Sequence, residues 1–94
     1  ALRYSEAIVE KVVEEKEKID SMIEKKLENW KMERVSLIDR LILRIALAEL
    51  VYFKSTPKEV IINEAVDIAH RFSSSKAGGF VNAILDRIAA EVRN

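Results

Sequence analysis

Glu64, Asp67 and His70 are the residues of this chain whose types and spacing could bind a metal ion or pair a general base with an orienting acid. Steps of three place them along one edge of a helix. The chain has one histidine and no cysteine, so thiolate metal sites and disulfides are excluded. Because two carboxylates and an imidazole are common on solvated helix surfaces, we predict no catalytic residue, metal site or cofactor. His70 is interpreted as a surface residue near Asp67.

Other enzymatic motifs are also missing from the sequence. Gly78-Gly79 has neither the third glycine nor the Lys-Ser/Thr pair of a phosphate-binding loop. No serine has histidine and aspartate in a recognisable arrangement for covalent catalysis. The sequence therefore predicts a protein that is not an enzyme.

Two arginines could instead contact a macromolecule. Arg40 and Arg44 lie one turn apart on the polar edge of an otherwise apolar helix. They could pair within the chain with Glu33, Glu49 or an N-terminal residue, or they could bind a carboxylate or phosphate of a partner.

Aromatic residues offer a second kind of contact. Phe80 stands near a helix start beside Lys76, Gly78 and Gly79, so its ring could lie in the core or stack on an RNA base. Trp30 follows the first long helical segment, and we interpret it as an anchor for the turn between two packed helices rather than as a stacking residue.

Charge and composition limit the possible partners. Sixteen Lys and Arg residues balance sixteen Asp and Glu residues, and 49% of the chain is hydrophobic. No general basic field is present, so contact with RNA must be local or shared with a partner. Ninety-four residues make one small domain, and no apolar run reaches the roughly 18–20 residues that would span a bilayer. The start of the chain has neither the features of a signal peptide nor an initiator methionine, so we expect a fragment of a longer, cytoplasmic protein.

The elements that must position these residues are helices throughout. Apolar spacing predicts one long helix, or two in line, over residues 5–28, whose most polar point is 14–18. Ser36 and Asp39 have capping-box spacing before a helix that runs to about Tyr52 and is apolar on most sides. Thr56 is expected to cap a helix over 57–72, with Ile61, Ala65, Ile68 and Phe72 facing inward. A last helix is expected over 77–92, where the two glycines let another backbone approach.

Three motifs in the second half of the chain resemble the NusB family of bacterial transcription antitermination proteins. Within residues 39–50, Asp39-Arg40 matches its pair of an acidic and a variable residue, which precedes Leu-Arg-Ile-Ala and Glu-Leu. Pro57, Val60 and residues 62–69 match its Pro, Val, Ile-Asn-Glu-Ala and Leu/Ile-Ala. Residues 80–86 match its Phe-Val-Asn-Gly-Val-Leu-Asp, with Ala83 at the usual glycine. The likeness covers about residues 4–93, although the first helix matches only by pattern.

This resemblance implies an all-α, NusB-like bundle of about four to five helices, in a single domain over residues 1–94 that corresponds to the family's C-terminal two-thirds. It also implies binding of boxA-type RNA together with a small-subunit ribosomal protein, NusE, in an RNA polymerase antitermination complex. Asp39 is similar to the family position that faces the protein partner, and Arg40 and Arg44 accompany it. Lys76 and Phe80 are similar to the region that approaches RNA.

The Arg-rich first helix of the family has no counterpart in this sequence. Without that cover, the apolar faces of Ile8, Val12 and the central helix are expected to be exposed and to favour a homo-oligomer or weak stability. Two alternative functions remain open. The same module resembles the RNA-binding domain of a 16S rRNA cytosine methyltransferase, and a helical protein-interaction or dimerisation module without RNA contact would share its features. The full-length gene would show an Arg-rich start, a large Gly-rich fold downstream, or neither.

Overall fold

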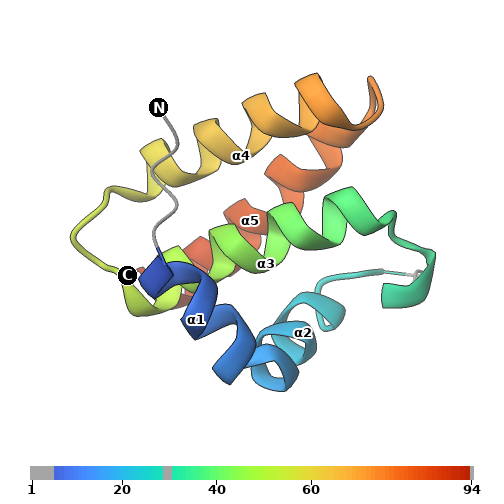
Figure 1. Cartoon of the computed structure of the whole chain (residues 1–94). Coiled ribbons are helices and arrows are strands. Elements are labelled where there is room, and N and C mark those ends of the chain that lie inside the picture. The colour runs from blue at the N-terminus through green and yellow to red at the C-terminus, as the bar shows by residue number, and fades with distance from the viewer. Residues whose placement is uncertain (1–5, 29–30, 94) are drawn as a thin grey trace.

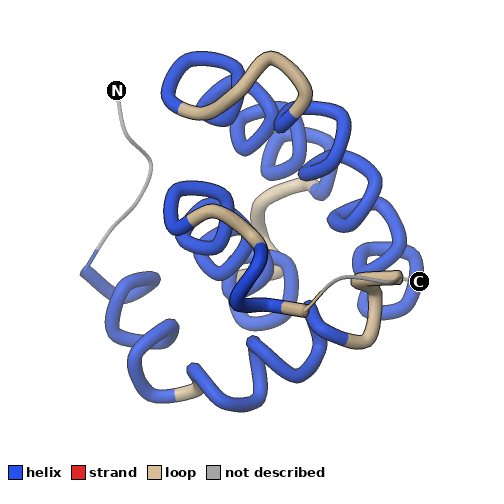
Figure 2. Tube along the Cα trace, turned by 90° about the vertical axis from the view of Figure 1, so that its right-hand side faces the viewer, coloured by secondary structure: helices blue, strands red, loops and turns tan. Residues whose placement is uncertain are grey.

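The computed structural model of the chain describes residues 6–28 and 31–93. Within these ranges every regular element is helical, and Figure 2 shows helices and loops without a strand. None of the described helices is long and apolar enough to cross a membrane. The prediction of an all-α fold is confirmed, whereas the role predicted for Trp30 lies outside the described residues. The elements are α1 (Glu6–Glu14), α2 (Lys16–Glu24), a short 3₁₀ helix η1 (Met32–Arg34), α3 (Leu37–Tyr52), α4 (Lys58–Phe72) and α5 (Ala77–Val92).

Helix α3 lies at the centre of the bundle. It contacts each of the other four α-helices, and Figure 1 shows it between α4 and the pair formed by α1 and α2, with α5 behind. Leu43, Leu47 and Leu50 of α3 are fully buried. Each such side chain stabilises the fold by about 1.5–3 kcal/mol relative to exposure. The apolar circumference predicted a central helix, and the structure confirms it.

Polar contacts define both ends of α3. The Ser36 hydroxyl accepts a hydrogen bond from the Asp39 backbone N–H at 3.1 Å, so the predicted N-terminal cap is confirmed. At the other end, the Arg93 guanidinium donates to the carbonyls of Leu50 and Thr56 at 2.8 Å each. These bonds satisfy carbonyls that the helix end leaves without a partner inside the helix. The C-terminal residues of α5 thereby fix the turn between α3 and α4.

The start of α4 differs from the prediction. Pro57, not Thr56, occupies the cap position, and no side chain caps the helix. The carbonyl of Pro57 accepts from the N–H of Ile61 at 3.2 Å, while its ring fixes φ at −59°. Since proline holds the entry geometry and the carbonyl of Thr56 binds Arg93, a threonine cap is not used.

The first half of the chain forms two helices that meet at an angle (Figure 1). The break falls at Glu15, where φ is −110° and ψ is 23°, inside the polar stretch that the sequence marked. Residues 14–18 are all charged, so a straight helix there would bury no apolar side chain. The bend instead lets Ile8 of α1 and Ile19 of α2 both reach the core.

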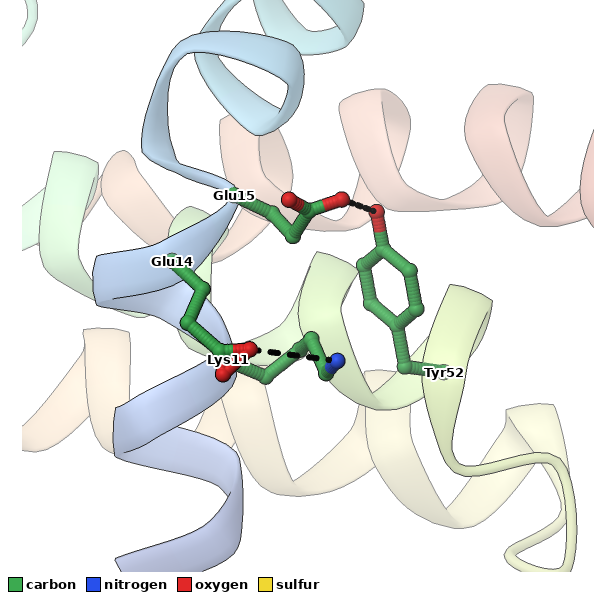
Figure 3. A network of polar contacts seen from close by, with 4 residues as sticks. All are labelled: Lys11, Glu14, Glu15 and Tyr52. Carbon is green, nitrogen blue, oxygen red and sulfur yellow. Dashed lines mark hydrogen bonds and ion pairs between the residues drawn. The ribbon is translucent and has the colours of Figure 1, made fainter.

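Glu15 also ties this bend to the end of α3 (Figure 3). Its carboxylate accepts a hydrogen bond from the Tyr52 hydroxyl at 3.1 Å, and Lys11 Nζ lies 5.1 Å from the centre of the Tyr52 ring. Lys11 also pairs with Glu14 at 3.5 Å. Burial and then the neighbouring Glu15 carboxylate raise the pKa of Tyr52 above its ordinary value, because both disfavour the phenolate.

We predict an alkaline loss of stability from Tyr52. Because its folded-state pKa is raised, the neutral tyrosine stabilises the fold below about pH 10, and this contribution disappears as pH rises through the raised pKa. The Tyr52→Phe variant should therefore lose less stability than the parent chain between pH 9 and 11, roughly the range around the ordinary tyrosine pKa. Urea unfolding at each pH measures this. Identical pH profiles for the two proteins would contradict the assignment.

An apolar groove of about 200 Å³ runs between α3 and α4. Phe72 was expected to face inward, but 69% of its surface is exposed, because it borders this groove where no described segment covers it. Leu37, Ile38 and Leu41 of α3 are exposed beside it, which agrees with the expected uncovered face of the central helix. The same expectation is wrong for Ile8, which is buried because α1 packs on α3.

We predict that this groove drives self-association of the chain. Analytical ultracentrifugation should show a larger average mass as concentration rises, and Phe72→Ser should shift the population towards monomer without unfolding it, since the ring is already exposed. Val13→Ser, which changes an exposed apolar residue of α1 outside the groove, is the matched control. A folded monomer at high concentration would refute the prediction.

Candidate nucleic-acid interface

A pocket of about 410 Å³ is lined by residues at the starts of α3 and α5. Both helices begin towards the right-hand side of the bundle in Figure 1. The volume of the pocket lies within the roughly 300–1,000 Å³ of small-ligand sites. The pocket brings together three residues that the sequence singled out separately, Asp39, Lys76 and Phe80. The remaining lining residues are Arg34, Val35, Ser36, Ser74 and Ala77.

Asp39 is the unusual member of this pocket. Its side chain is 91% buried, since only 9% is exposed, and its Oδ1 atom has no hydrogen-bond partner among the described residues. An unsatisfied buried acceptor costs about 1–3 kcal/mol, and more when it is charged. The N-terminus of α3 returns only about 0.3–1 kcal/mol to a carboxylate in its first turn. The fold alone therefore does not account for a carboxylate at this position.

Phe80 and Lys76 come from the first turn of α5 and the residue before it. The Phe80 ring is half-buried against the core, while Lys76 is exposed and forms no ion pair within the described part of the chain. A Cβ added at Gly79 would meet nothing within 4 Å, so the backbone beside Phe80 borders open space. Part of the ring packs on the core and Phe80 also lines the pocket, so the stacking role stays a prediction.

Arg34 is a pocket residue that the sequence analysis missed. It ends η1, a single turn that carries no hydrophobic periodicity, and its side chain is exposed. With Lys76 it gives the pocket two cations around one buried carboxylate. Only the packing of the loop before α3 against α5 could bring these residues together, and no sequence spacing indicates that packing.

The side chain of His70, and not another backbone as predicted, lies close to Gly78. A Cβ at this position would lie 2.4 Å from Nε2 of His70, so the glycine accommodates an imidazole ring from α4 rather than another backbone. His70 therefore has a packing role beside the pocket. Asp67 does not join it but pairs with Arg71 at 3.4 Å. Within residues 6–28 and 31–93, no three histidine or acidic residues come close enough to hold a metal ion.

The two arginines of α3 differ in their surroundings. Arg44 donates two hydrogen bonds to Asp20 of α2, at 2.7 and 3.0 Å, so the N-terminal pairing that the sequence left open is the one formed. Its guanidinium is engaged inside the chain. Arg40 Nε is buried without a hydrogen-bond partner among the described residues, although the residue is only partly buried. Of the two, only Arg44 is fixed by an ion pair among the described residues.

An all-helical bundle with a pocket at the start of its central helix, lined by Phe80 and the charged residues Arg34, Asp39 and Lys76, is the class of protein that fold and site define. The family model described as "NusB family" matches residues 2–90, and the chain belongs to that family. Similar curated proteins are called "Transcription antitermination protein NusB". The chain is 44% identical to that of Natranaerobius thermophilus over 96% of its length, and 51% identical to that of Koribacter versatilis over 81%.

Solved structures agree with this membership. A T. maritima NusB structure superposes with a TM-score of 0.88 at 44% identity over 90% of the chain. A chain from the structure described as "Crystal Structure of a Plectonemic RNA Supercoil" superposes with a TM-score of 0.86 at 35% identity over 92%. The chain spans 65% and 52% of the two curated relatives and 60% of the T. maritima chain.

We predict that the Asp20–Arg44 pair is a strong structural contact. The two side chains are only 19% and 11% exposed, so Asp20→Asn should lower the free energy of unfolding by about 1.5–3 kcal/mol, the range for hydrogen bonds to charged groups. Urea unfolding followed by circular dichroism measures the change. Asp67→Asn is the matched control, because its pair with Arg71 is 61% and 68% exposed and should contribute less than about 0.5 kcal/mol. Equal losses in the two variants would contradict the prediction.

Proposed function

We propose that the chain is the RNA-binding part of a bacterial transcription antitermination factor that acts in the cytoplasm on single-stranded boxA-type RNA. The observation that carries this proposal is the pocket that combines Phe80 with Arg34 and Lys76. An aromatic ring can stack on a base for about 1–3 kcal/mol, and adjacent cations neutralise phosphates. The names of the curated relatives and the RNA-containing structural neighbour support the same function.

The modest charge of the site is consistent with shared binding. The whole chain has zero net charge, so two cations at one pocket give a weak, local attraction for RNA. We therefore propose that a second protein, the small-subunit ribosomal protein NusE, binds beside the pocket and completes the RNA-binding surface in the RNA polymerase complex. Arg40 is the residue we assign to this contact, because it is only partly buried and, unlike Arg44, forms no ion pair with the described residues. Asp39 lies at the boundary between the two binding surfaces.

We predict specific RNA binding that depends on Phe80. Fluorescence anisotropy of labelled boxA-type RNA, against a scrambled RNA and at two salt concentrations, should show binding that tightens when NusE is added. Phe80→Leu keeps most of the core packing but removes the aromatic face, and should weaken binding by roughly 5- to 150-fold. Lys76→Gln should reduce the salt dependence by about 0.7 in the log–log slope, the value for one phosphate contact on a single strand.

The matched controls are Phe72→Leu and Lys58→Gln, which change an exposed phenylalanine and an exposed lysine outside the pocket. Equal weakening by the Phe80 and Phe72 variants would remove the pocket from the mechanism. No binding in any mixture would favour the alternative of a helical interaction module without RNA contact. Binding to 16S rRNA fragments in preference to boxA-type RNA would favour the methyltransferase-domain alternative.

A further inference from the structure

The first turn of α5 carries Phe80 and follows Lys76, yet it has few of the features that hold a helix start in place. Lys76 is the N-cap residue, and no side chain caps the helix. Two of the first three helical residues are glycines, and each favours the open turn by roughly four- to fivefold relative to alanine. The first i→i−4 hydrogen bond, from the Phe80 N–H to the Lys76 carbonyl, is long at 3.3 Å. This turn therefore depends on support from outside α5.

His70, in the last turn of α4, supplies such support. The Nε2 edge of its imidazole occupies the space that a Cβ at Gly78 would need, so the ring lies directly against the glycine backbone. Gly78 is buried although it has no side chain, whereas Gly79 is exposed and a Cβ there would meet nothing. The ring thus shields the backbone of this turn from water, which otherwise competes for its hydrogen bonds.

We infer that His70 is a positioning residue for RNA binding, because its ring keeps the first turn of α5 closed and Phe80 at the pocket. This inference rests on the proposed RNA-binding function and assigns a role to a residue that does not line the pocket. Ala77 and Phe80 hold the turn from the core side, and His70 holds it from α4. His70 therefore acts through α5 and not through contact with the RNA.

Opening of the turn lowers RNA affinity although no RNA contact is removed. Only molecules with the turn formed present Phe80 at the pocket, and the apparent dissociation constant rises in inverse proportion to their fraction. The remainder of α5 does not depend on His70, since Val81, Leu85 and Ile88 are fully buried in the core. Loss of the exposed imidazole should thus affect local order at the start of α5 and leave global stability nearly unchanged.

Amide hydrogen exchange and RNA binding together test this role in the full chain. In the His70→Ala variant the Phe80 amide should exchange about fivefold faster, and boxA-type RNA should bind up to about fivefold more weakly, the scale set by one helical glycine. Exchange at Ile88 and the equilibrium constant for urea unfolding should change by about twofold or less, as for other exposed substitutions. Asn63→Ala changes another exposed residue of α4, and this matched control should alter neither measurement at the pocket.

A second substitution separates the order of the turn from the identity of residue 70. Gly79→Ala adds a methyl group in open space and supplies the helix propensity that the turn lacks. Combined with His70→Ala, it should return the exchange rate of the Phe80 amide to about the parent value. In the Gly79→Ala background, His70→Ala should also cost less RNA affinity than in the parent chain, because the turn stays closed without the ring.

The outcomes separate this role from the proposed function. Unchanged exchange at Phe80 in His70→Ala would overturn the positioning role, whatever the RNA affinity. Faster exchange without any loss of RNA affinity would overturn it as well, and would leave the proposed function standing if Phe80→Leu still weakens binding. An equal loss of affinity in the parent and Gly79→Ala backgrounds would assign His70 a direct contact with RNA instead. No RNA binding by the parent chain, with or without NusE, would overturn the proposed function and the positioning role together.

Discussion

The burial of α3 on almost every side is the constraint on which the arrangement of the other helices depends. On its buried faces such a helix can carry polar groups only where a partner satisfies them or where an end reaches solvent. Arg44 follows the first route, because α2 brings Asp20 to it. The bend at Glu15 makes this pairing possible, because it turns α2 so that α1 and α2 both contact α3. Arg93, at the C-terminal cap of α5, donates a hydrogen bond to the Leu50 carbonyl near the C-terminal end of α3.

The pocket results from the packing around the N-terminal end of α3. There the helix begins next to the start of α5 and the turn of η1, and these three pieces enclose a space rather than filling it. Asp39 is buried by this geometry without receiving a partner from it. A buried acceptor left unsatisfied in this way resembles sites where local stability is exchanged for recognition.

Sequence patterns predicted the parts of this structure that depend on local signals. The boundaries of α3 and α5 follow from apolar periodicity and the Ser36 cap, and both agree with the structure to within about a residue. Contacts across the bundle were not predictable in the same way. Phe72 has the right spacing for a buried stripe, but whether it is covered depends on neighbours that its own helix does not determine. Arg34 and Arg93 bear no periodic signal, and their roles arise only when distant segments meet. The family motifs indicated Asp39, Lys76 and Phe80 as separate features, and only the three-dimensional arrangement unites them in one pocket.

The contact between His70 and Gly78 restricts how this surface can change in evolution or design. Any side chain at position 78 would overlap the imidazole at 2.4 Å, so a substitution there requires a smaller or displaced residue at position 70. The contact joins α4 to α5 beside the pocket. Libraries that randomise residues near Phe80 should vary positions 70 and 78 jointly, because a side chain at 78 fits only where the imidazole is displaced or replaced.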